Sequence, residues 1–341
     1  MPGKILRRIG LGLLGLLVLL VVVGYLIPRH SHLERTIDLK ARPATVFAVL
    51  NGFARFNDWS PWARLDPNAK YARSGPETGV GAKLAWHSDD PNVGSGSQEI
   101  VESVPNQRIV LTLRFEGFAQ ENHASFTLSP VAGGTHLVWG YDGDAGFNLM
   151  GRYFSLFCDK FIGPDYERGL QNLKKLVEAL PDADLGTIHP EVVDVPAATL
   201  AYVSGTTSTD PDVIGTAYAV AIGKVSGYLH NARVKPTGAP RAIARKWDPA
   251  SKTYEYDIGL PVPEATKPSV AVHVSRTYSG RAVKEVYRGS YRNLSPTYDA
   301  LFAYLGASGL QLAGNPWEEY VSDPATTPPD QLVTNIYLPV R

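Results

Sequence analysis

The chain has 341 residues, of which 44% are hydrophobic and 19% charged, with 33 basic and 33 acidic side chains. This composition is typical of a globular protein, and the length is sufficient for two domains with separate cores. The balanced charge gives no indication of a surface that binds nucleic acid. Cys158 is the only cysteine, which excludes an intrachain disulfide and a CxxC metal or redox motif.

Residues 9–27 form an uncharged run, IGLGLLGLLVLLVVVGYLI, about as long as a helix that crosses the ~30 Å hydrocarbon core of a bilayer. Lys4, Arg7 and Arg8 precede this run. Because basic residues favour the cytoplasmic side, we expect residues 1–31 to form a cytoplasmic N-terminus and a transmembrane anchor, with the soluble domains outside the cytoplasm, in a bacterium the periplasm. The alternative is a cleaved secretory signal, although no small-x-small cleavage site follows the run.

The first soluble domain is expected at residues 32–181. A strand pattern at 34–39 precedes a helix that starts at Pro43, because proline is favoured at the first helical position. Glycine, proline and asparagine clusters separate the strand-like runs that follow, as in an antiparallel meander, at 83–86, 97–104, 108–115, 123–128 and 135–139. A helical pattern from 151 to 180, interrupted at Gly163-Pro164, carries one apolar stripe that should lie across the sheet.

The order strand, short helix, meander and long terminal helix resembles the SRPBCC, or polyketide cyclase/dehydrase-like (START-like), family. The motifs that carry the resemblance are ERTI at 34–37, ARPATVF at 41–47, WSPW at 59–62 and YERGLQNL at 166–173. The resemblance implies a helix-grip fold with a deep apolar cavity between sheet and long helix, for lipids, polyketides or similar hydrophobic molecules. It implies no common catalytic residue. The tryptophans of this domain either line such a cavity or pack in the core.

An internal repeat marks the second soluble domain, expected at residues 187–341. The segments GAP at 238–240, DP at 248–249 and IGLPV at 258–262 recur as GNP at 314–316, DP at 323–324 and IYLPV at 336–340. A helix with an Asp-Pro or Ser-Pro start precedes each copy, at 210–211 and 295–296. Each unit therefore reads strand, helix, strand, strand, and we expect one pseudo-symmetric domain with a cleft between the copies. The predicted fold class of the chain is α+β.

This arrangement is similar to the GyrI-like, or AraC/Rob-type effector-binding, domain. The motifs that carry the similarity are YDIGLPV at 256–262, YRGSY at 287–291, LSPTYDAL at 294–301 and PWEEYVSDP at 316–324. In that family an acidic residue two positions before a tyrosine reads the ligand in an aromatic-lined cleft, which implies this role for Glu318. The family usually has a histidine where this chain has Tyr287, so chemistry that depends on that imidazole is in doubt.

Glu318 is the principal candidate site residue. Alternation along a strand directs Glu318 and Tyr320 to one face and Trp317 and Glu319 to the other, so the two glutamates do not form a catalytic pair. A carboxylate walled by aromatic rings is partly desolvated, which raises its pKa, and it selects cationic or hydrogen-bond-donating ligands. The candidate ligand-binding residues are Glu318, Tyr320, Trp317, Tyr256, Tyr254, Tyr287 and Tyr291; for each aromatic residue, core packing is an equal alternative.

We therefore expect a membrane-anchored binding protein for hydrophobic or amphipathic small molecules, with no catalytic residue, no cofactor and no nucleic-acid partner. No metal site is expected, because His30 and His32 lack acidic or cysteine companions. The sequence contains no GxxxxGK[ST] motif and no GxGxxG motif after a strand, so it gives no indication of nucleotide binding. The alternative is a hydrolase or detoxifying enzyme of the GyrI-like type in which Glu318 acts as general base. A weaker alternative is an interaction protein of the cell envelope.

Overall fold

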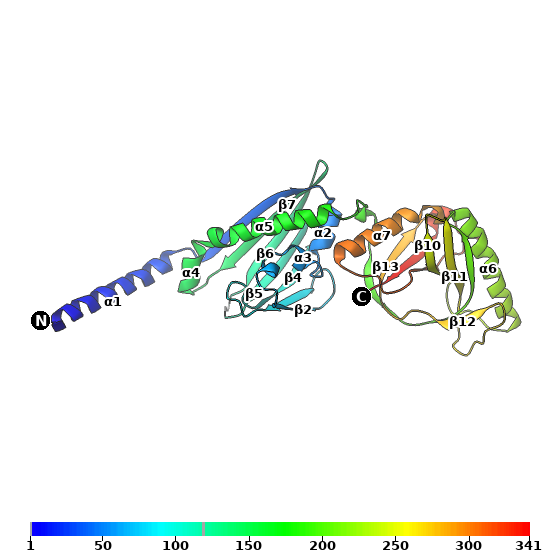
Figure 1. Cartoon of the computed structure of the whole chain (residues 1–341), viewed down its shortest axis with the longest axis horizontal. Helices are drawn as coiled ribbons and strands as arrows, with labels where there is room; N and C mark the ends of the chain where they lie inside the picture. Colours follow the sequence, from blue (N-terminus) through cyan, green and yellow to red (C-terminus); the bar gives the residue numbers. More distant parts are fainter. Residues whose placement is uncertain (1, 118–119) are drawn as a thin grey trace. The chain divides into compact units, whose positions relative to one another are not determined.

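Alternating apolar and polar residues predict strands in both halves of the chain, and the computed structural model, which describes residues 2–117 and 120–341, arranges them in two antiparallel sheets (Figure 1). The sheets belong to two compact units, with the strands of the first sheet before Asp182 and those of the second after it. Helices accompany each sheet. The α+β class expected from the sequence is confirmed.

The sheet of the first unit has seven strands in the order β1-β7-β6-β5-β4-β3-β2, and every neighbouring pair is antiparallel. The strands are β1 (His30–Leu39), β2 (Lys70–Ser74), β3 (Lys83–His87), β4 (Gly96–Val104), β5 (Arg108–Phe115), β6 (Asn122–Val131) and β7 (Gly134–Asp144). The meander from β3 to β7 is the predicted one. Strand β2 is the unexpected element, because its sequence KYARS has no apolar alternation and it pairs with β3 alone at the sheet edge.

The helices of the first unit are α1 (Pro2–Leu26), α2 (Pro43–Leu50), α3 (Phe56–Trp59), α4 (Leu149–Ser155) and α5 (Cys158–Glu178), with a 3₁₀ turn η1 at Trp62–Arg64. The long terminal helix is interrupted at Leu156-Phe157 rather than at Gly163-Pro164, where the sequence predicted the break. Pro164 lies inside α5 on its exposed side, where water can satisfy the carbonyl that loses its hydrogen-bond partner.

Packed aromatic rings fill the interior of the first unit between β7 and α5. Trp139 of β7 stacks on Tyr166 of α5 with ring centroids 3.8 Å apart, and Trp59 meets Trp139 edge-on at 5.3 Å. Leu170 and Leu173 continue the buried face of α5. Trp59 and Trp139 are therefore core residues. Of the two alternatives for these tryptophans, core packing and cavity lining, the structure shows core packing. A surface groove of about 780 Å³ lies outside this core, beside α5.

The sheet of the second unit has eight strands in the order β12-β9-β11-β10-β14-β15-β13-β8. The strands are β8 (Glu191–Val195), β9 (Thr199–Ser208), β10 (Arg241–Asp248), β11 (Thr253–Val262), β12 (His273–Arg276), β13 (Gly280–Arg288), β14 (Trp317–Tyr320) and β15 (Val333–Pro339). The predicted repeat is present as β9-α6-β10-β11 and β13-α7-β14-β15. Each copy contributes three adjacent strands, and the pairing of β10 with β14 joins the copies.

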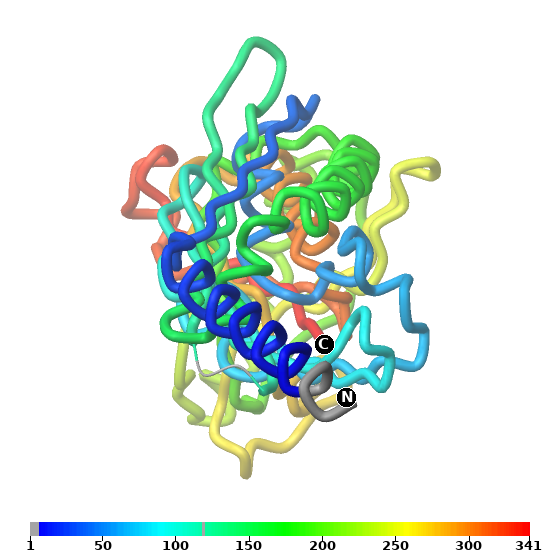
Figure 2. Tube along the Cα trace, turned by 90° about the vertical axis from the view of Figure 1, so that its left-hand side faces the viewer, coloured from blue at the N-terminus to red at the C-terminus, as the bar shows by residue number. Residues whose placement is uncertain are grey.

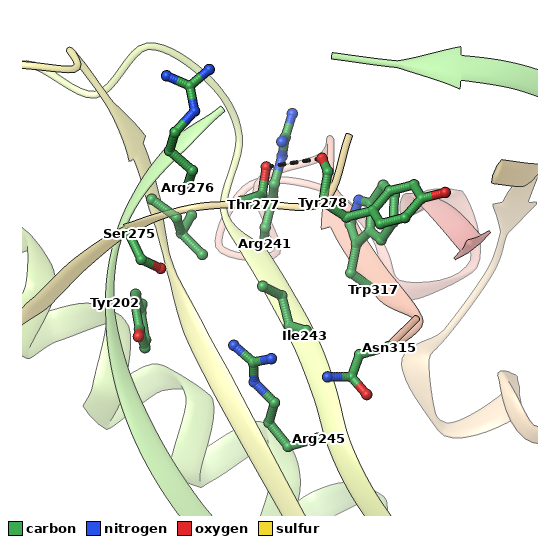
Figure 3. Close-up of a pocket in the computed structure, with 11 residues that line it drawn as sticks. Tyr202, Arg241, Ile243, Arg245, Ser275, Arg276, Thr277, Tyr278, Asn315 and Trp317 are labelled. Atoms are coloured by element: carbon green, nitrogen blue, oxygen red, sulfur yellow. Dashed lines mark hydrogen bonds between the residues drawn. The ribbon is translucent and has the colours of Figure 1, made fainter. Parts of the chain in front are cut away.

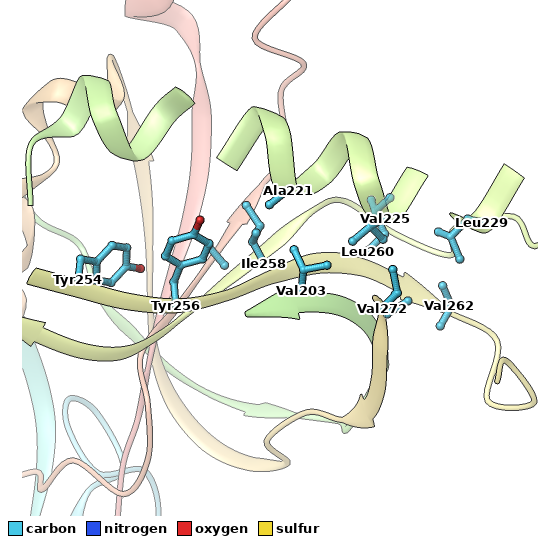
Figure 4. Packing of buried hydrophobic residues seen from close by; sticks show 12 residues of the cluster. Val203, Ala221, Val225, Leu229, Tyr254, Tyr256, Ile258, Leu260, Val262 and Val272 are labelled. Carbon is cyan, nitrogen blue, oxygen red and sulfur yellow. The ribbon is translucent and has the colours of Figure 1, made fainter. Parts of the chain in front are cut away.

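Two long helices belong to this unit, α6 (Pro211–Asn231) and α7 (Ser295–Ser308), and 3₁₀ turns occur at η2 (Leu185–Thr187), η3 (Tyr291–Asn293) and η4 (Pro329–Gln331). Asp210 caps α6 as predicted, since its side chain accepts from the backbone amide of Asp212 at 2.9 Å. The apolar side of α6 packs on β9 and β11 through Val225 and Ile258, among others (Figure 4). This core fixes the helix-covered face of the sheet.

Candidate functional site

Glu318 lies at the seam between the two repeats. Strand β14 has four residues, and Glu318 is opposite Ala242 of β10 on one side and Ile336 of β15 on the other. Backbone pleating turns Glu318 and Tyr320 toward the helix-covered face and Trp317 and Glu319 toward the opposite face. The site is therefore built from both copies of the repeat.

The two carboxylate oxygens of Glu318 each accept a hydrogen bond from a tyrosine. The hydroxyl of Tyr298 in α7 donates to Oε1 at 2.8 Å, and the hydroxyl of Tyr320 donates to Oε2. Burial raises the pKa of the Glu318 carboxyl above its usual value, while the two hydrogen bonds oppose the rise because they stabilise the ionised form. Glu318 is half-buried as a residue, and its carboxyl group is enclosed by the protein.

Further tyrosines surround this carboxylate. Tyr218 of α6 and Tyr254 of β11 share a hydroxyl–hydroxyl hydrogen bond of 2.7 Å, and the ring of Tyr218 lies 4.9 Å from that of Tyr256 and 6.2 Å from that of Tyr320. The ring of Tyr291 contacts Tyr320 edge-on at 5.3 Å. We call the six residues the tyrosine cluster: Tyr218, Tyr254, Tyr256, Tyr291, Tyr298 and Tyr320. Figure 4 shows Tyr254 and Tyr256 side by side on β11.

The hydroxyls of the cluster stay protonated near neutral pH. Burial raises the pKa values of Tyr218, Tyr254 and Tyr298, and the nearby charge of Glu318 raises them further. The Tyr291 hydroxyl is buried and has no hydrogen-bond partner within residues 2–117 and 120–341. A buried donor without a partner is unfavourable by about 1–3 kcal/mol. The cluster therefore contains a buried polar group whose hydrogen-bonding capacity is not used.

Five of the seven predicted site residues come together in this cluster: Glu318, Tyr320, Tyr254, Tyr256 and Tyr291. The other two lie elsewhere. Trp317 is on the opposite face, where its ring stacks on Tyr337 at 4.8 Å, and Tyr287 donates to the backbone oxygen of Ser290 at 2.9 Å.

Sequence reasoning missed Tyr218 and Tyr298 as site residues. Both lie on the sides of α6 and α7 that face the site. The signal that could have identified them is the hydroxyl each one adds to a stripe of otherwise aliphatic and small residues, since a buried tyrosine hydroxyl requires a partner.

The opposite face of the sheet holds a separate cavity of about 120 Å³ (Figure 3). Its lining includes Arg241, Arg245 and Arg276 together with Trp317. Each arginine already pairs with a carboxylate: Arg241 with Glu319 at 3.0 Å, Arg245 with Asp257 and Arg276 with Glu264. Because these charges are compensated, the cavity is a weaker candidate than the tyrosine cluster.

One helix in the described part of the chain, Arg7–Leu26, is long and apolar enough to cross a membrane. A secretory signal near an N-terminus has the same length and composition. The helix continues through the short link Ile27–Arg29 into β1 (Figure 2). No group of three histidine, cysteine or acidic side chains suited to a metal ion occurs among the residues searched, which are those the structure describes.

Comparison with known proteins identifies both halves. Residues 30–178 match the family model for polyketide cyclase/dehydrase and lipid transport, and residues 189–341 match that of the GyrI-like small molecule binding domain. These are the two predicted families in the predicted order. No curated protein sequence matches the chain.

Similar solved structures have low sequence identity. The C-terminal domain of EcmrR is 15% identical, with coverage of 45% of this chain and 98% of that one and a TM-score of 0.41. A hydrolase from Listeria innocua is 17% identical, with coverage of 45% and 91% and a TM-score of 0.34. The Aha1 dimer from Colwellia psychrerythraea is 16% identical, with coverage of 43% and 96% and a TM-score of 0.33.

Proposed function

We propose that this chain, in which a polyketide cyclase/dehydrase and lipid-transport domain precedes a GyrI-like small-molecule-binding domain, is a membrane-anchored binding protein for lipophilic cations. Both domains belong to families that bind small molecules. The observation that carries the proposal is the desolvated carboxylate of Glu318 inside the tyrosine cluster.

The charge of the site favours a cation. A carboxylate removed from water is stabilised when a positive ligand approaches, and the faces of tyrosine rings contribute about 0.5–2 kcal/mol each to cation binding. Tyr298 and Tyr320 donate to Glu318 and so hold it in place. The apolar surface of the ligand adds roughly 25 cal/mol per Å² buried. A flat or bulky organic cation supplies the positive charge, contacts the tyrosine rings and buries apolar surface.

The contacts of α1 support an anchor that stays attached. Helix α4 packs on the end of α1, where the Tyr153 hydroxyl donates to the carbonyl of Leu20 at 2.6 Å and Arg152 donates to the carbonyls of Tyr25 and Ile27 at 2.9 and 3.0 Å. A cleaved signal would leave these partners of α4 unpaired. The basic residues before the span favour an N-terminus in the cytoplasm, with domains 32–181 and 187–341 on the other side.

A glutamate-dependent hydrolase is the second candidate, because a carboxyl with a raised pKa is closer to the value that a general base needs near neutral pH. The arrangement favours binding over this chemistry. Both oxygens of Glu318 already accept hydrogen bonds from Tyr298 and Tyr320, which lowers their basicity toward a water molecule.

The test uses two probes of the same shape and opposite charge, tetraphenylphosphonium and tetraphenylborate. We expect the full chain in detergent to bind the cation and not the anion, and Glu318→Gln to weaken cation binding at least about tenfold, which corresponds to about 1.4 kcal/mol. Glu319→Gln is the matched control, since the neighbouring glutamate faces the other side and pairs with Arg241. Equal binding of the cation by wild type and Glu318→Gln would contradict the proposal.

Incubation of the same variants with a panel of esters, amides and epoxides separates the two candidates. Product that forms with wild type and disappears with Glu318→Gln supports the hydrolase. The proposed topology has its own test, in which a reporter that is active only in the cytoplasm is fused after Arg341. An active reporter would overturn the placement of the domains outside the cytoplasm.

A further inference from the structure

A row of exposed apolar side chains follows α4 and the first turn of α5. Its members are Phe147, Met150, Phe154, Phe157 and Phe161, and the first two are 82% and 78% exposed. Phe147 precedes α4, and the spacing of four, three and four residues from Met150 to Phe161 places the other four on one side of α4 and the first turn of α5. The rings of Phe154 and Phe161 stack at 5.8 Å, and Phe157 lies 6.1 Å from Phe161. Contiguous apolar surface of this kind marks an interaction site on a soluble domain.

The other side of α4 is fixed to the end of α1. Gly24 makes room for Leu149, since a Cβ atom at Gly24 would lie 2.5 Å from Leu149 Cδ1. The bonds of Tyr153 and Arg152 to the backbone of α1, described above, hold the same side of α4 against the helix. The position of the apolar row relative to α1 is therefore set by direct contacts within one unit.

These contacts fix the depth of α4 relative to the apolar helix. Leu20, which accepts the bond from Tyr153, precedes the end of α1 at Leu26 by six residues, or about 9 Å along the axis at 1.5 Å per residue. That level lies within the apolar span Arg7–Leu26. A bilayer that surrounds α1 consequently reaches α4, and the outward row faces the same lipid.

We infer that Phe147, Met150, Phe154, Phe157 and Phe161 form a membrane-contact surface that lies in the lipid interface beside α1. The inference rests on the proposed membrane anchor and deepens it. The occupant is the lipid bilayer, because the row lies on α4 and the start of α5, and α4 contacts the apolar helix α1 within its span. Exposed Lys160, in the same turn as Phe157 and Phe161, suits the phosphate groups at that level.

The consequence concerns the first unit as a whole. Helix α5 begins in this surface at Cys158 and continues into the buried face that contains Tyr166 and Leu170. The helix that covers the interior of the polyketide cyclase/dehydrase-type domain thus starts at the lipid interface. A lipophilic molecule that leaves the bilayer next to Phe161 meets this domain without crossing bulk water.

Spin labels on the full chain test the inference in vesicles of phosphatidylcholine and phosphatidylglycerol. In a Cys158→Ser background, single cysteines replace Phe161, Leu16 or Val131. Val131 is the matched control, since it is 43% exposed against 56% for Phe161 but is the last residue of β6, at the end of the sheet far from α1. The expected result is that the labels at 161 and 16 are accessible to oxygen and protected severalfold from a water-soluble nickel chelate. The label at 131 should be accessible to the nickel chelate and less accessible to oxygen.

The outcomes distinguish this inference from the anchor itself. A label at 161 that resembles the one at 131, while the label at 16 is in lipid, overturns the membrane-contact surface and leaves the anchor intact. A label at 16 that is exposed to the nickel chelate overturns both. Spin–spin broadening at 161 that disappears on dilution with unlabelled chain shows that a second copy covers the row, which also overturns the inference.

Discussion

The hydroxyl of Tyr298 in α7 donates a hydrogen bond of 2.8 Å to Oε1 of Glu318 in β14. This bond connects the helix of the second repeat to the strand at the seam between the repeats. Tyr218, from the helix of the first repeat, reaches the same place through its contact with Tyr320. The pairing of β10 with β14 thus brings side chains of both helices to one carboxylate.

Tyr298→Phe removes one of the two donors to Glu318. Since a hydrogen bond to the ionised carboxyl lowers its pKa, we expect the pKa of Glu318 to rise further in this variant. Binding of tetraphenylphosphonium needs the ionised form, so the midpoint of a binding titration against pH should move to higher pH, and affinity at pH 7 should fall. Tyr287→Phe, which removes a hydroxyl that donates to the Ser290 backbone, should leave the midpoint unchanged.

Stability in the absence of ligand should depend on the ionisation of Glu318. The folded-state pKa of this acid lies above its unfolded value, so its contribution to stability is present at low pH and is lost as pH rises through the folded pKa. Glu318→Gln cannot ionise and is expected to raise the free energy of unfolding at pH 7. Urea unfolding of both proteins at several pH values measures the difference, and a variant that is less stable at pH 7 would contradict the expectation.

Gly205 on β9 provides the space that the Tyr256 ring occupies. A Cβ atom at this position would lie 2.5 Å from the ring's Cζ and hydroxyl oxygen. We expect Gly205→Ala to displace Tyr256 from the tyrosine cluster, to lower the free energy of unfolding by about 1–3 kcal/mol and to weaken cation binding. Near-UV circular dichroism reports the displacement. Gly223→Ala on α6, where nothing lies within 4 Å, is the control and should not weaken binding.

Trp139→Ala should destabilise the first unit alone. The substitution removes the stack on Tyr166, the edge contact with Trp59 and the tilted contact with Phe126. A buried tryptophan replaced by alanine typically lowers stability by about 3–5 kcal/mol. Binding of tetraphenylphosphonium at Glu318 should persist, because the tyrosine cluster belongs to the second unit. Limited proteolysis with separate detection of the two units checks both expectations.

Several features of the fold could be predicted from local sequence because they depend on neighbours along the chain. Asp210 and Pro211 mark the start of α6, and the duplicated motifs predict two copies of strand, helix, strand, strand. The position of the helix break was wrong. A proline on the exposed side of a helix removes one hydrogen bond that water can replace, so Pro164 did not end α5.

Alternation along β14 determined from sequence alone that Glu318 and Glu319 face opposite sides, since the period of a strand is two residues. Which aromatic residues from elsewhere in the chain meet Glu318 depended on the pairing of β10 with β14 and on the two helices. These bring Tyr298, 20 positions away in the sequence, and Tyr218, 100 positions away, to Glu318. The sequence determined the acid and the direction it faces; the tertiary structure decided its neighbours, because contacts between distant segments follow from the register and packing of whole elements.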